Sequence, residues 1–249
     1  AICQPATISL NGSGLATITP AAVNGGSTDN CTIASMQVSP TTFTSAGDHA
    51  VTLTVTDARG NVGSCTTTVH VVDNIPPVAI CKDTTVYLAS SGQSSINAVA
   101  LDGGSSDNGA IAGFSASRTA FTCAELGANT DTLRVMDVSG NSSTCTATVL
   151  VVDTIPPAAV CRPVTVYLGP TGTATVTASQ VENGSTDNCA VASSALSVQD
   201  FTSTGEFNGT YVVWDNSGNR DSCFTTITVV DTTAPTVACA GPTYAAVPQ

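Results

Sequence analysis

Ten cysteines carry the most evident chemistry in this 249-residue chain. No Cys-x-x-Cys pair occurs among them, and neither histidine, His49 or His70, belongs to a cysteine cluster, which argues against a zinc site. Regularly placed cysteines in a chain with a single lysine, Lys82, are typical of disulfides formed in an oxidising compartment. We therefore expect a protein that is secreted, extracellular or held at the cell surface.

The residue patterns that common catalytic sites need are missing. The sequence contains no Gly-x-Ser-x-Gly nucleophile motif and no glycine-rich phosphate loop. His70 falls on the outward phase of a predicted strand and His49 in a predicted loop beside Asp48, so both are expected at the surface. A glycosidase that uses paired carboxylates stays open, but the prominent acids recur periodically, which indicates architecture. We expect no enzyme.

Composition excludes two classes of partner. Six Lys and Arg against 18 Asp and Glu give a net charge of −12, which repels nucleic-acid phosphates and anionic membrane surfaces. The mean hydropathy is +0.24, but the longest apolar runs, such as residues 149–152, are far shorter than the roughly 20 residues of a membrane-spanning helix. We expect neither nucleic-acid binding nor membrane insertion.

An internal repeat organises these residues. The cysteine of an Ile-Cys or similar opening recurs at spacings of 78, 80 and 78 residues. Each unit then carries an Asp-Asn loop, an Asp-x-x-Gly-Asn segment with a cysteine four residues later, and a Val-Val-Asp ending before a proline joint. The predicted domains are residues 1–77 (repeat 1), 78–157 (repeat 2) and 158–235 (repeat 3), with 236–249 as the start of a fourth repeat or an exchanged strand.

Each repeat is predicted to consist of β-strands. Residues 52–56 and 66–71 alternate polar and apolar side chains and are rich in β-branched types. The Asp-x-x-Gly-Asn segment between them is typical of a hairpin turn. About 80 residues with six or seven short strands fit one immunoglobulin-like sandwich, so we expect an all-β chain of three tandem sandwiches plus the first strand of a fourth. The proline joints should make a semi-rigid array.

These motifs resemble the hyalin-repeat class of immunoglobulin-like domains, in particular those repeated in giant surface adhesins of gliding and predatory bacteria. The likeness rests on the Ile-Cys opening, Ser-Thr-Asp-Asn-Cys, Asp-x-Ser-Gly-Asn-x-x-x-Cys and Val-Val-Asp-Thr-Ile-Pro-Pro. It implies an extracellular, non-enzymatic stalk, filament or adhesin, which we expect to associate with copies of itself. Two alternatives stay open, an adhesive module for a glycan or protein and an accessory domain of a secreted hydrolase.

The resemblance also implies a disulfide pattern. In immunoglobulin-like sandwiches the first and last strands run parallel side by side, so the expected pairs are Cys3–Cys65, Cys81–Cys145 and Cys161–Cys223. No repeat holds a second pair. The remaining cysteines are therefore predicted either to bond between chains or repeats or to be free thiols; they are Cys31, Cys123, Cys189 and Cys239.

The same topology predicts acidic junctions. The Asp-Asn loop and the hairpin lie at the pole where a domain begins, and the Val-Val-Asp ending of the preceding domain meets them there. Clustered oxygen ligands without a compensating base suit Ca²⁺, although Asp and Asn also form turns by bonding their own backbone. The candidate calcium ligands are Asp29, Asp57, Asp73, Asn74, Asp107, Asn108, Asp137, Asn141, Asp153, Asp187, Asn188, Asp215 and Asn219. No other cofactor is expected.

Modification and lateral contact complete the expectations. Asp-Thr followed by an apolar residue or threonine resembles a bacterial O-glycosylation signal and occurs at Thr84, Thr132, Thr154 and Thr232. Asn-x-Ser/Thr triplets begin at Asn11, Asn30, Asn141, Asn183 and Asn208. Met136 and Trp214 occupy one equivalent outward position, which predicts a lateral contact between strands of a bundle, unless Trp214 covers its own sheet edge.

Overall fold

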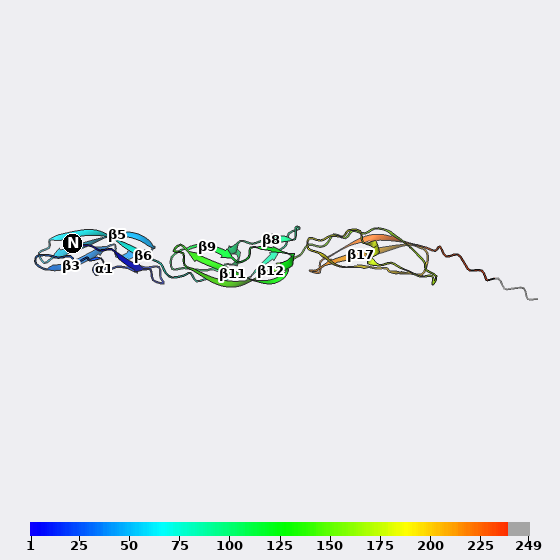
Figure 1. The fold of residues 1–249 in the computed structure, drawn as a ribbon, viewed down its shortest axis with the longest axis horizontal. Helices are drawn as coiled ribbons and strands as arrows, with labels where there is room; N and C mark the ends of the chain where they lie inside the picture. Colours follow the sequence, from blue (N-terminus) through cyan, green and yellow to red (C-terminus); the bar gives the residue numbers. More distant parts are fainter. Residues whose placement is uncertain (239–249) are drawn as a thin grey trace, which may run out of the picture. The chain divides into compact units, whose positions relative to one another are not determined.

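The computed structural model describes residues 1–238, and these residues form β-structure almost throughout (Figure 1). The strand predicted at 236–249 lies, apart from its first three residues, outside the described residues. Each of the three repeats contains six strands. The strands of repeat 1 are β1 (Ala6–Ser9), β2 (Ala16–Thr17), β3 (Ile33–Ser39), β4 (Thr42–Phe43), β5 (Gly47–Asp57) and β6 (Val62–Val72).

Repeats 2 and 3 follow the same order. Those of repeat 2 are β7 (Thr84–Tyr87), β8 (Gln93–Ser95), β9 (Ile111–Ala116), β10 (Ala120–Thr122), β11 (Gly127–Asp137) and β12 (Ser142–Val152). Those of repeat 3 are β13 (Val164–Tyr167), β14 (Ala174–Thr175), β15 (Val191–Leu196), β16 (Asp200–Phe201), β17 (Gly205–Asp215) and β18 (Arg220–Val230).

Every repeat pairs one larger sheet with one small sheet. The larger sheet of repeat 1 has the order β1-β6-β5-β3, and β2 and β4 form the small one. The first strand, β1, runs parallel to the last, β6, with Ala6 opposite Val69, and the other pairings are antiparallel. Repeats 2 and 3 have the same strand orders. The predicted all-β chain of tandem sandwiches is confirmed.

The long hairpin of each repeat forms the core and follows from the sequence pattern. Leu53 and Val69, on alternating positions of β5 and β6, are fully buried and pack with Phe43 of the small sheet. The turn between the strands needs a left-handed residue, which Gly60 supplies with φ of 87°. In repeat 3, Tyr211 takes the place of Leu53, and burial raises the pKa of its hydroxyl.

Short helical turns connect the strands. They are α1 (Pro20–Val23), α2 (Ala178–Val181) and the 3₁₀ turns η1 (Ala98–Leu101) and η2 (Cys123–Glu125). Each is one turn long, so no helical period could be visible in the sequence. Thr177 and Gln180 form a capping box at α2, and Thr122 and Glu125 form one at η2.

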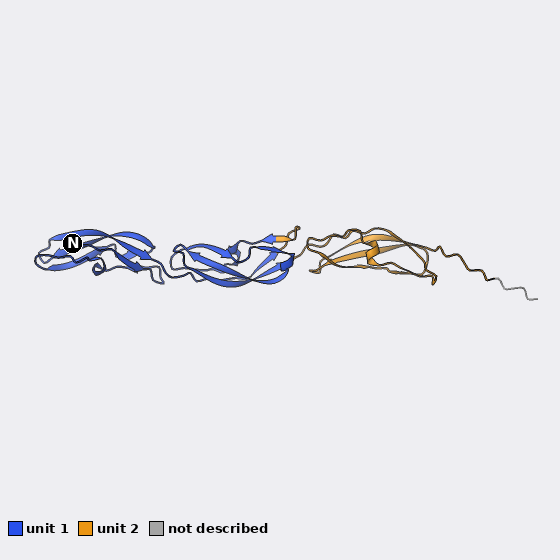
Figure 2. Cartoon of the chain, in the orientation of Figure 1, with its two compact units in different colours: residues 1–86, 94–152 blue, residues 87–93, 153–249 orange. Residues whose placement is uncertain are grey.

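The chain divides into two compact units (Figure 2). The first unit comprises Ala1–Val86 and Ser94–Val152, and the second comprises Tyr87–Gln93 and the residues from Asp153 onward. Repeat 1 and most of repeat 2 therefore belong to the first unit. The repeat boundaries at residues 77, 157 and 235 stay predictions, although each six-strand set falls within one repeat.

Candidate functional sites

Three disulfides join the opening cysteine of each repeat to its last strand. Cys3 bonds to Cys65 with 5.9 Å between their Cα atoms. The corresponding distances are 5.7 Å for Cys81–Cys145 and 6.2 Å for Cys161–Cys223. Each bond closes a loop of 62 or 64 residues. By lowering the conformational entropy of the unfolded chain, such a bond stabilises the folded state by about 4 kcal/mol.

The other cysteines differ among themselves. Cys123, in η2, and Cys189, after the Asp-Asn loop of repeat 3, are also disulfide-bonded. Cys31 is an exposed free thiol. Cys239 lies outside the described residues. Bonding between repeats or between chains stays a prediction for these four residues.

A first acidic joint forms where repeat 1 runs into repeat 2, within the first unit. It consists of Asp73, Asp107, Asn108, Asp137 and Asn141. One carboxylate oxygen from each of the three aspartates lies within 4.8 Å of the others. Asp73, at the end of the repeat 1 strand, is 6% exposed, and Asp137, in the hairpin, is 1% exposed. The Asp-Asn loop, the hairpin and the preceding linker thus meet.

Two asparagine amides fasten the linker in this joint. Asn108 Nδ2 donates to Asp73 Oδ1 at 3.2 Å and to the Asn11 carbonyl at 3.3 Å. Asn141 Nδ2 donates to the Asp73 carbonyl at 3.0 Å and to Asp137 Oδ2 at 2.8 Å. Both the backbone and the side chain of Asp73 are therefore held by residues of repeat 2.

A turn of repeat 1 closes against the same joint. Gly14 has φ of +71°, and a Cβ built on it would collide with the Asn108 carbonyl oxygen. Its position therefore requires glycine for two reasons, the left-handed backbone and the close approach of the neighbouring chain. The sequence pattern did not mark this turn as part of the junction.

A second acidic joint repeats the arrangement within the second unit. It consists of Asp153, Asp187, Asn188, Asp215 and Asn219. Asn188 Nδ2 donates to Asp153 Oδ1 at 3.1 Å, and Asn219 Nδ2 donates to the Asp153 carbonyl at 3.1 Å and to Asp215 Oδ2 at 2.7 Å. Asp153 is 3% exposed, and it groups with Asp187 and the sulfur of Cys189 within 4.8 Å.

The remaining candidate ligands lie apart from these clusters. Asp29 and Asp57 lie in the Asp-Asn loop and the hairpin of repeat 1, at the positions equivalent to Asp107 and Asp137. Asp29 is exposed and Asp57 is partly exposed, and Asn74 is exposed in the linker. The hydrogen bond from the Asn61 side chain, aided by backbone N–H groups, lowers the pKa of Asp57.

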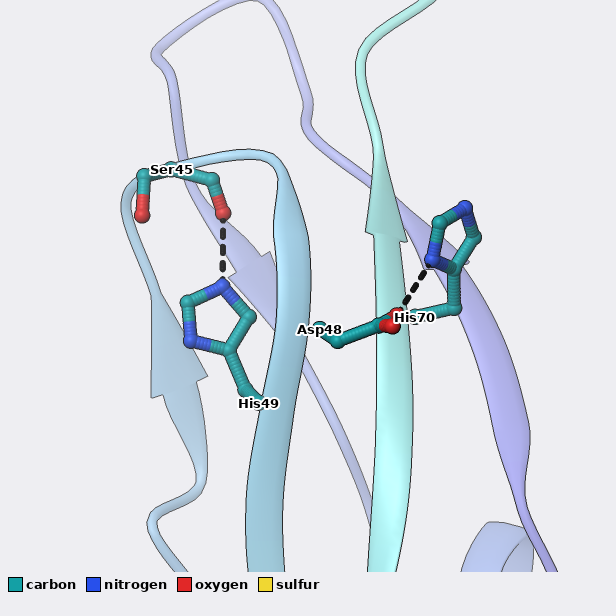
Figure 3. A network of polar contacts seen from close by, with 4 residues as sticks. All are labelled: Ser45, Asp48, His49 and His70. Atoms are coloured by element: carbon teal, nitrogen blue, oxygen red, sulfur yellow. Dashed lines mark hydrogen bonds and ion pairs between the residues drawn. The ribbon is translucent and has the colours of Figure 1, made fainter.

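The histidines form surface hydrogen bonds in repeat 1 (Figure 3). His70 Nδ1 lies 2.6 Å from Asp48 Oδ1, with both side chains more than half exposed. His49 Nε2 lies 3.0 Å from the Ser45 carbonyl, and its ring centroid is 5.0 Å from that of Phe43. The expectation of a loop at His49 was wrong, because the long β5 begins at Gly47 and places this residue half-buried in a strand.

The threonines of the O-glycosylation pattern fall into two environments. Thr154 and Thr232 are exposed in linkers, whereas Thr84 and Thr132 are half-buried in strands. Among the Asn-x-Ser/Thr asparagines, Asn141 uses its side-chain amide to donate hydrogen bonds in the first joint. The other four are exposed; they are Asn11, Asn30, Asn183 and Asn208.

The two outward apolar residues differ in exposure. Met136 of β11 is 37% exposed, and Trp214 of β17 is half-buried. Phe224 of β18 is 82% exposed, and the sequence analysis missed it. The signal was available, since Thr66 and Thr146 occupy the equivalent positions one residue after the late cysteine. Among the described residues, no helix is long and apolar enough to cross a membrane.

Comparison with known proteins finds similarity to hyalin. The chain is 34% identical to hyalin of the sea urchin Strongylocentrotus purpuratus over 80% of its own length and 18% of the relative's. It is 35% identical to hyalin of Lytechinus variegatus over 78% of its length and 38% of the relative's. The chain thus spans less than two fifths of either protein. No family model matches it.

Solved structures give only distant likeness. Drosophila N-cadherin domains 1–4 align with a TM-score of 0.37 and 11% identity, covering 76% of this chain and 58% of that one. Sidekick-1 immunoglobulin domains 1–4 align with a TM-score of 0.36 and 9% identity, covering 91% and 74%. The hyalin matches support the resemblance stated from the motifs, whereas its bacterial form stays a prediction. The chain is thus similar in sequence to hyalin over about four fifths of its length.

Proposed function

We propose that this chain is a non-catalytic part of an extracellular adhesion-type protein, in which the repeats act as stiff spacers of a stalk or filament. One observation carries the proposal, the linker aspartate that is buried in the pole of the following repeat and held by two asparagine amides. It occurs with Asp73 and again with Asp153. A linker bonded through both backbone and side chain loses most of its freedom to rotate.

The covalent framework supports the same function. One disulfide staples each sandwich, and such bonds persist in secreted and surface proteins. The similarity to hyalin fits an extracellular role. The motifs quoted above favour a giant bacterial surface adhesin as the parent protein, and exposed Thr154 and Thr232 are the O-glycosylation candidates that an enzyme could reach most easily.

The stiffness of the first joint can be tested by small-angle X-ray scattering on the full chain. Asn108→Ala combined with Asn141→Ala should broaden the distribution of interatomic distances, because the linker is released. The matched control is Asn30→Ala with Asn61→Ala, the equivalent residues of repeat 1, which should leave the distribution unchanged. A wild-type chain that already scatters as a flexible string would refute the spacer function.

Association with copies of itself is the second part of the proposal. Met136 and Trp214 stand on outward strand faces, where a second chain could pack. Trp214→Ala should weaken assembly, measured by analytical ultracentrifugation, while the melting temperature stays nearly constant. Tyr167→Ala, which removes another exposed aromatic ring of repeat 3, serves as control. If Trp214→Ala unfolds repeat 3 and assembly persists, the residue belongs to its own domain.

The cysteines outside the three staples would add cross-links. We assign Cys123 and Cys189 to bonds between repeats or chains because no repeat contains a second pair, and exposed Cys31 could form such a bond with another chain. Peptide mapping of unreduced protein by mass spectrometry identifies the partners of Cys123 and Cys189 directly. Reduced forms of both in native material would contradict the assignment.

An adhesive module remains the second candidate, because repeat 3 exposes an aromatic ring at a position where repeats 1 and 2 carry threonine. Phe224 lies on the outward face of β18, opposite Thr210 of β17. Phe224→Thr introduces the residue found in repeats 1 and 2, so the fold should tolerate it. Loss of binding to a glycan array or to candidate surface proteins would favour this function, and unchanged binding would remove Phe224 from it.

A further inference from the structure

The acids of the two joints lack any basic partner. Among the described residues the sole ion pair is the one between Asp48 and His70, and it includes none of the joint acids. In the first joint the carboxylates of Asp73, Asp107 and Asp137 nevertheless lie within 4.8 Å of one another. Like charges at this separation in a buried site repel each other strongly unless a cation or protons compensate them.

Oxygen atoms in both joints are buried without a hydrogen-bond donor. In the second joint these include Oδ2 of Asp153, whose side chain is 3% exposed, and Oδ1 of Asp187. In the first joint they are Oδ1 of Asp107 and Oδ1 of Asn108. A buried acceptor left unpaired costs free energy, so a missing donor or a missing cation is expected there.

The hydrogen bonds of the joint explain why these oxygens are left over. Asp153 Oδ1 accepts from Asn188 Nδ2 and from the Ile155 N–H, which leaves Oδ2 for another partner. Asp107 Oδ2 accepts from the Gly109 N–H, which leaves Oδ1 in the same way. The amides thus orient the carboxylates and use one oxygen of each. The second oxygens, Asp153 Oδ2 and Asp107 Oδ1, are buried and have no hydrogen-bond partner.

A small residue keeps space beside the first cluster. A Cβ built on Gly109 would lie 3.3 Å from Asp107 Oδ2 and 3.4 Å from Asp73 Oδ2. A solvent-open hollow, lined in part by Asp73, Asn108 and Gly109, reaches this point and offers an entry path. The equivalent residue of the second joint is Cys189, whose sulfur is in a disulfide and cannot act as a thiolate ligand.

We propose that each joint binds one calcium ion. The donors are hard oxygens of carboxylates and an amide, the set that Ca²⁺ prefers, and thiolate or free imidazole ligands that would select zinc are absent from the described clusters. The ion would be held by Asp73, Asp107, Asn108 and Asp137 in the first joint. In the second it would be held by Asp153 and Asp187. The hairpin of repeat 3 places Asp215 at the sequence position that Asp137 holds in repeat 2.

Such an ion would tie three segments of each joint together. The linker aspartate, the Asp-Asn loop and the hairpin would share one centre of positive charge, in addition to the amide bonds already described. The proposed spacer function does not depend on it, since the amides hold the linker without a metal. Failure of one proposal can therefore be told from failure of the other.

Calorimetry on the full chain tests the site. After removal of metals with a chelator, Ca²⁺ is titrated at about 150 mM NaCl, where general attraction to an acidic protein is screened. We expect two ions per chain and a rise in the midpoint of thermal unfolding with calcium concentration. Asp107→Asn and Asp187→Asn should each reduce the stoichiometry to one, because each removes one charge at nearly constant shape.

The matched control is Asp29→Asn. Asp29 accepts a backbone hydrogen bond from Cys31 as Asp107 does from Gly109, but it is exposed and belongs to neither acidic cluster. It should keep two ions per chain. No calcium heat and no thermal shift at millimolar calcium would overturn the proposal, as would an equal effect of Mg²⁺ or of Asp29→Asn. Circular dichroism of each variant separates lost binding from lost folding, and the wild-type stoichiometry decides the matter if a variant fails to fold.

Discussion

The poles of repeat 1 and repeat 2 carry the same hairpin, but only one of them is buried. Asp57 accepts hydrogen bonds from the N–H groups of Arg59 and Asn61 and from the Asn61 side chain. Asp137 accepts the equivalent three bonds from Ser139 and Asn141. Asp57 is nevertheless partly exposed, whereas Asp137 is 1% exposed.

The linker makes the difference. Asn141 has a second acceptor, the Asp73 carbonyl, for which Asn61 has no counterpart among the described contacts. The local turn chemistry is thus the same at both poles and does not depend on a neighbour. A joint therefore consists of this hairpin turn with the linker aspartate of the preceding repeat bound to it.

The largest loss of stability should come from adding a side chain at Gly14, where the backbone of repeat 1 approaches Asn108 of repeat 2. Gly14→Ala would place a methyl group against the Asn108 carbonyl and strain a left-handed backbone, at a cost of roughly 2–4 kcal/mol. Gly172 has nearly the same φ, +72°, and no atom near its Cβ position, so Gly172→Ala should carry only the backbone strain of about 1 kcal/mol. Urea unfolding measures both. Equal losses would mean that the turn does not contact repeat 2 in solution.

The hairpin aspartates come next. Asp137→Ala removes a nearly fully buried carboxylate that accepts three part-buried hydrogen bonds and should reduce the free energy of unfolding by about 2–3 kcal/mol. Asp57→Ala removes the same bonds where water can replace them, so its effect should be clearly smaller. Thermal denaturation of the two variants checks the order. A reversed order would show that the turn itself, rather than burial, carries the energy.

The asparagines should give a smaller contrast. Asn141→Ala frees both the Asp73 carbonyl and Asp137 Oδ2 and should cost about 1–2 kcal/mol. Asn61→Ala frees an exposed carboxylate only and should cost less. Hydrogen exchange of the linker amide of Ile75, which donates to Asp73 Oδ1, should accelerate in the first variant and stay unchanged in the second. Unchanged exchange in both would contradict the role assigned to Asn141.

The smallest expected effect is the loosening of the repeat 1 hairpin at low pH. The pKa of Asp57 is lowered from its usual value of 3.8 by its hydrogen bonds, chiefly that from the Asn61 side chain. Its contribution to stability is therefore complete above the unfolded-state pKa and is lost as the pH falls through the lower folded-state value. The repeat 1 hairpin should stay closed at neutral pH and loosen only below about pH 4. An NMR titration that shows the Asn61 side-chain amide shifting near neutral pH would disprove this.

Local patterns allowed most of the fold to be predicted. The alternation around Leu53 predicted the long hairpin, and the Asp-x-x-Gly-Asn spacing predicted its turn, because both depend on neighbouring residues. Two-residue strands such as β2 and the one-turn helices were not predicted, since tertiary packing, and no periodic pattern, determines them. The contact of Gly14 with Asn108 spans 94 residues and leaves no signal in a single sequence.

For the candidate site, the sequence predicted which kinds of residue take part but not which of them lie together. Thirteen Asp and Asn residues came from three recurring segments, and the structure separates the members of the two joints from Asp29, Asp57 and Asn74. The distinction depends on which loops meet in space, and composition could not supply it. Exposed Phe224 was not predicted, because the sequence motifs were defined by residues that recur between repeats. Phe224 departs from them, since the equivalent residues are Thr66 and Thr146.

The disulfides also determine how far the chain can lengthen under tension. Force applied along the chain enters a repeat near Cys3, crosses to Cys65 through the sulfur bridge and leaves through the last strand, so the residues inside the loop carry no load. Cys81 follows Cys65 by sixteen positions along the chain, and Cys161 follows Cys145 by sixteen. At roughly 3.4 Å per residue, each such segment reaches at most about 55 Å, even when every sandwich has lost its fold. A fully unfolded repeat without the bridge would reach about five times as far, so the stapled chain behaves as a tether with a short, built-in limit of extension.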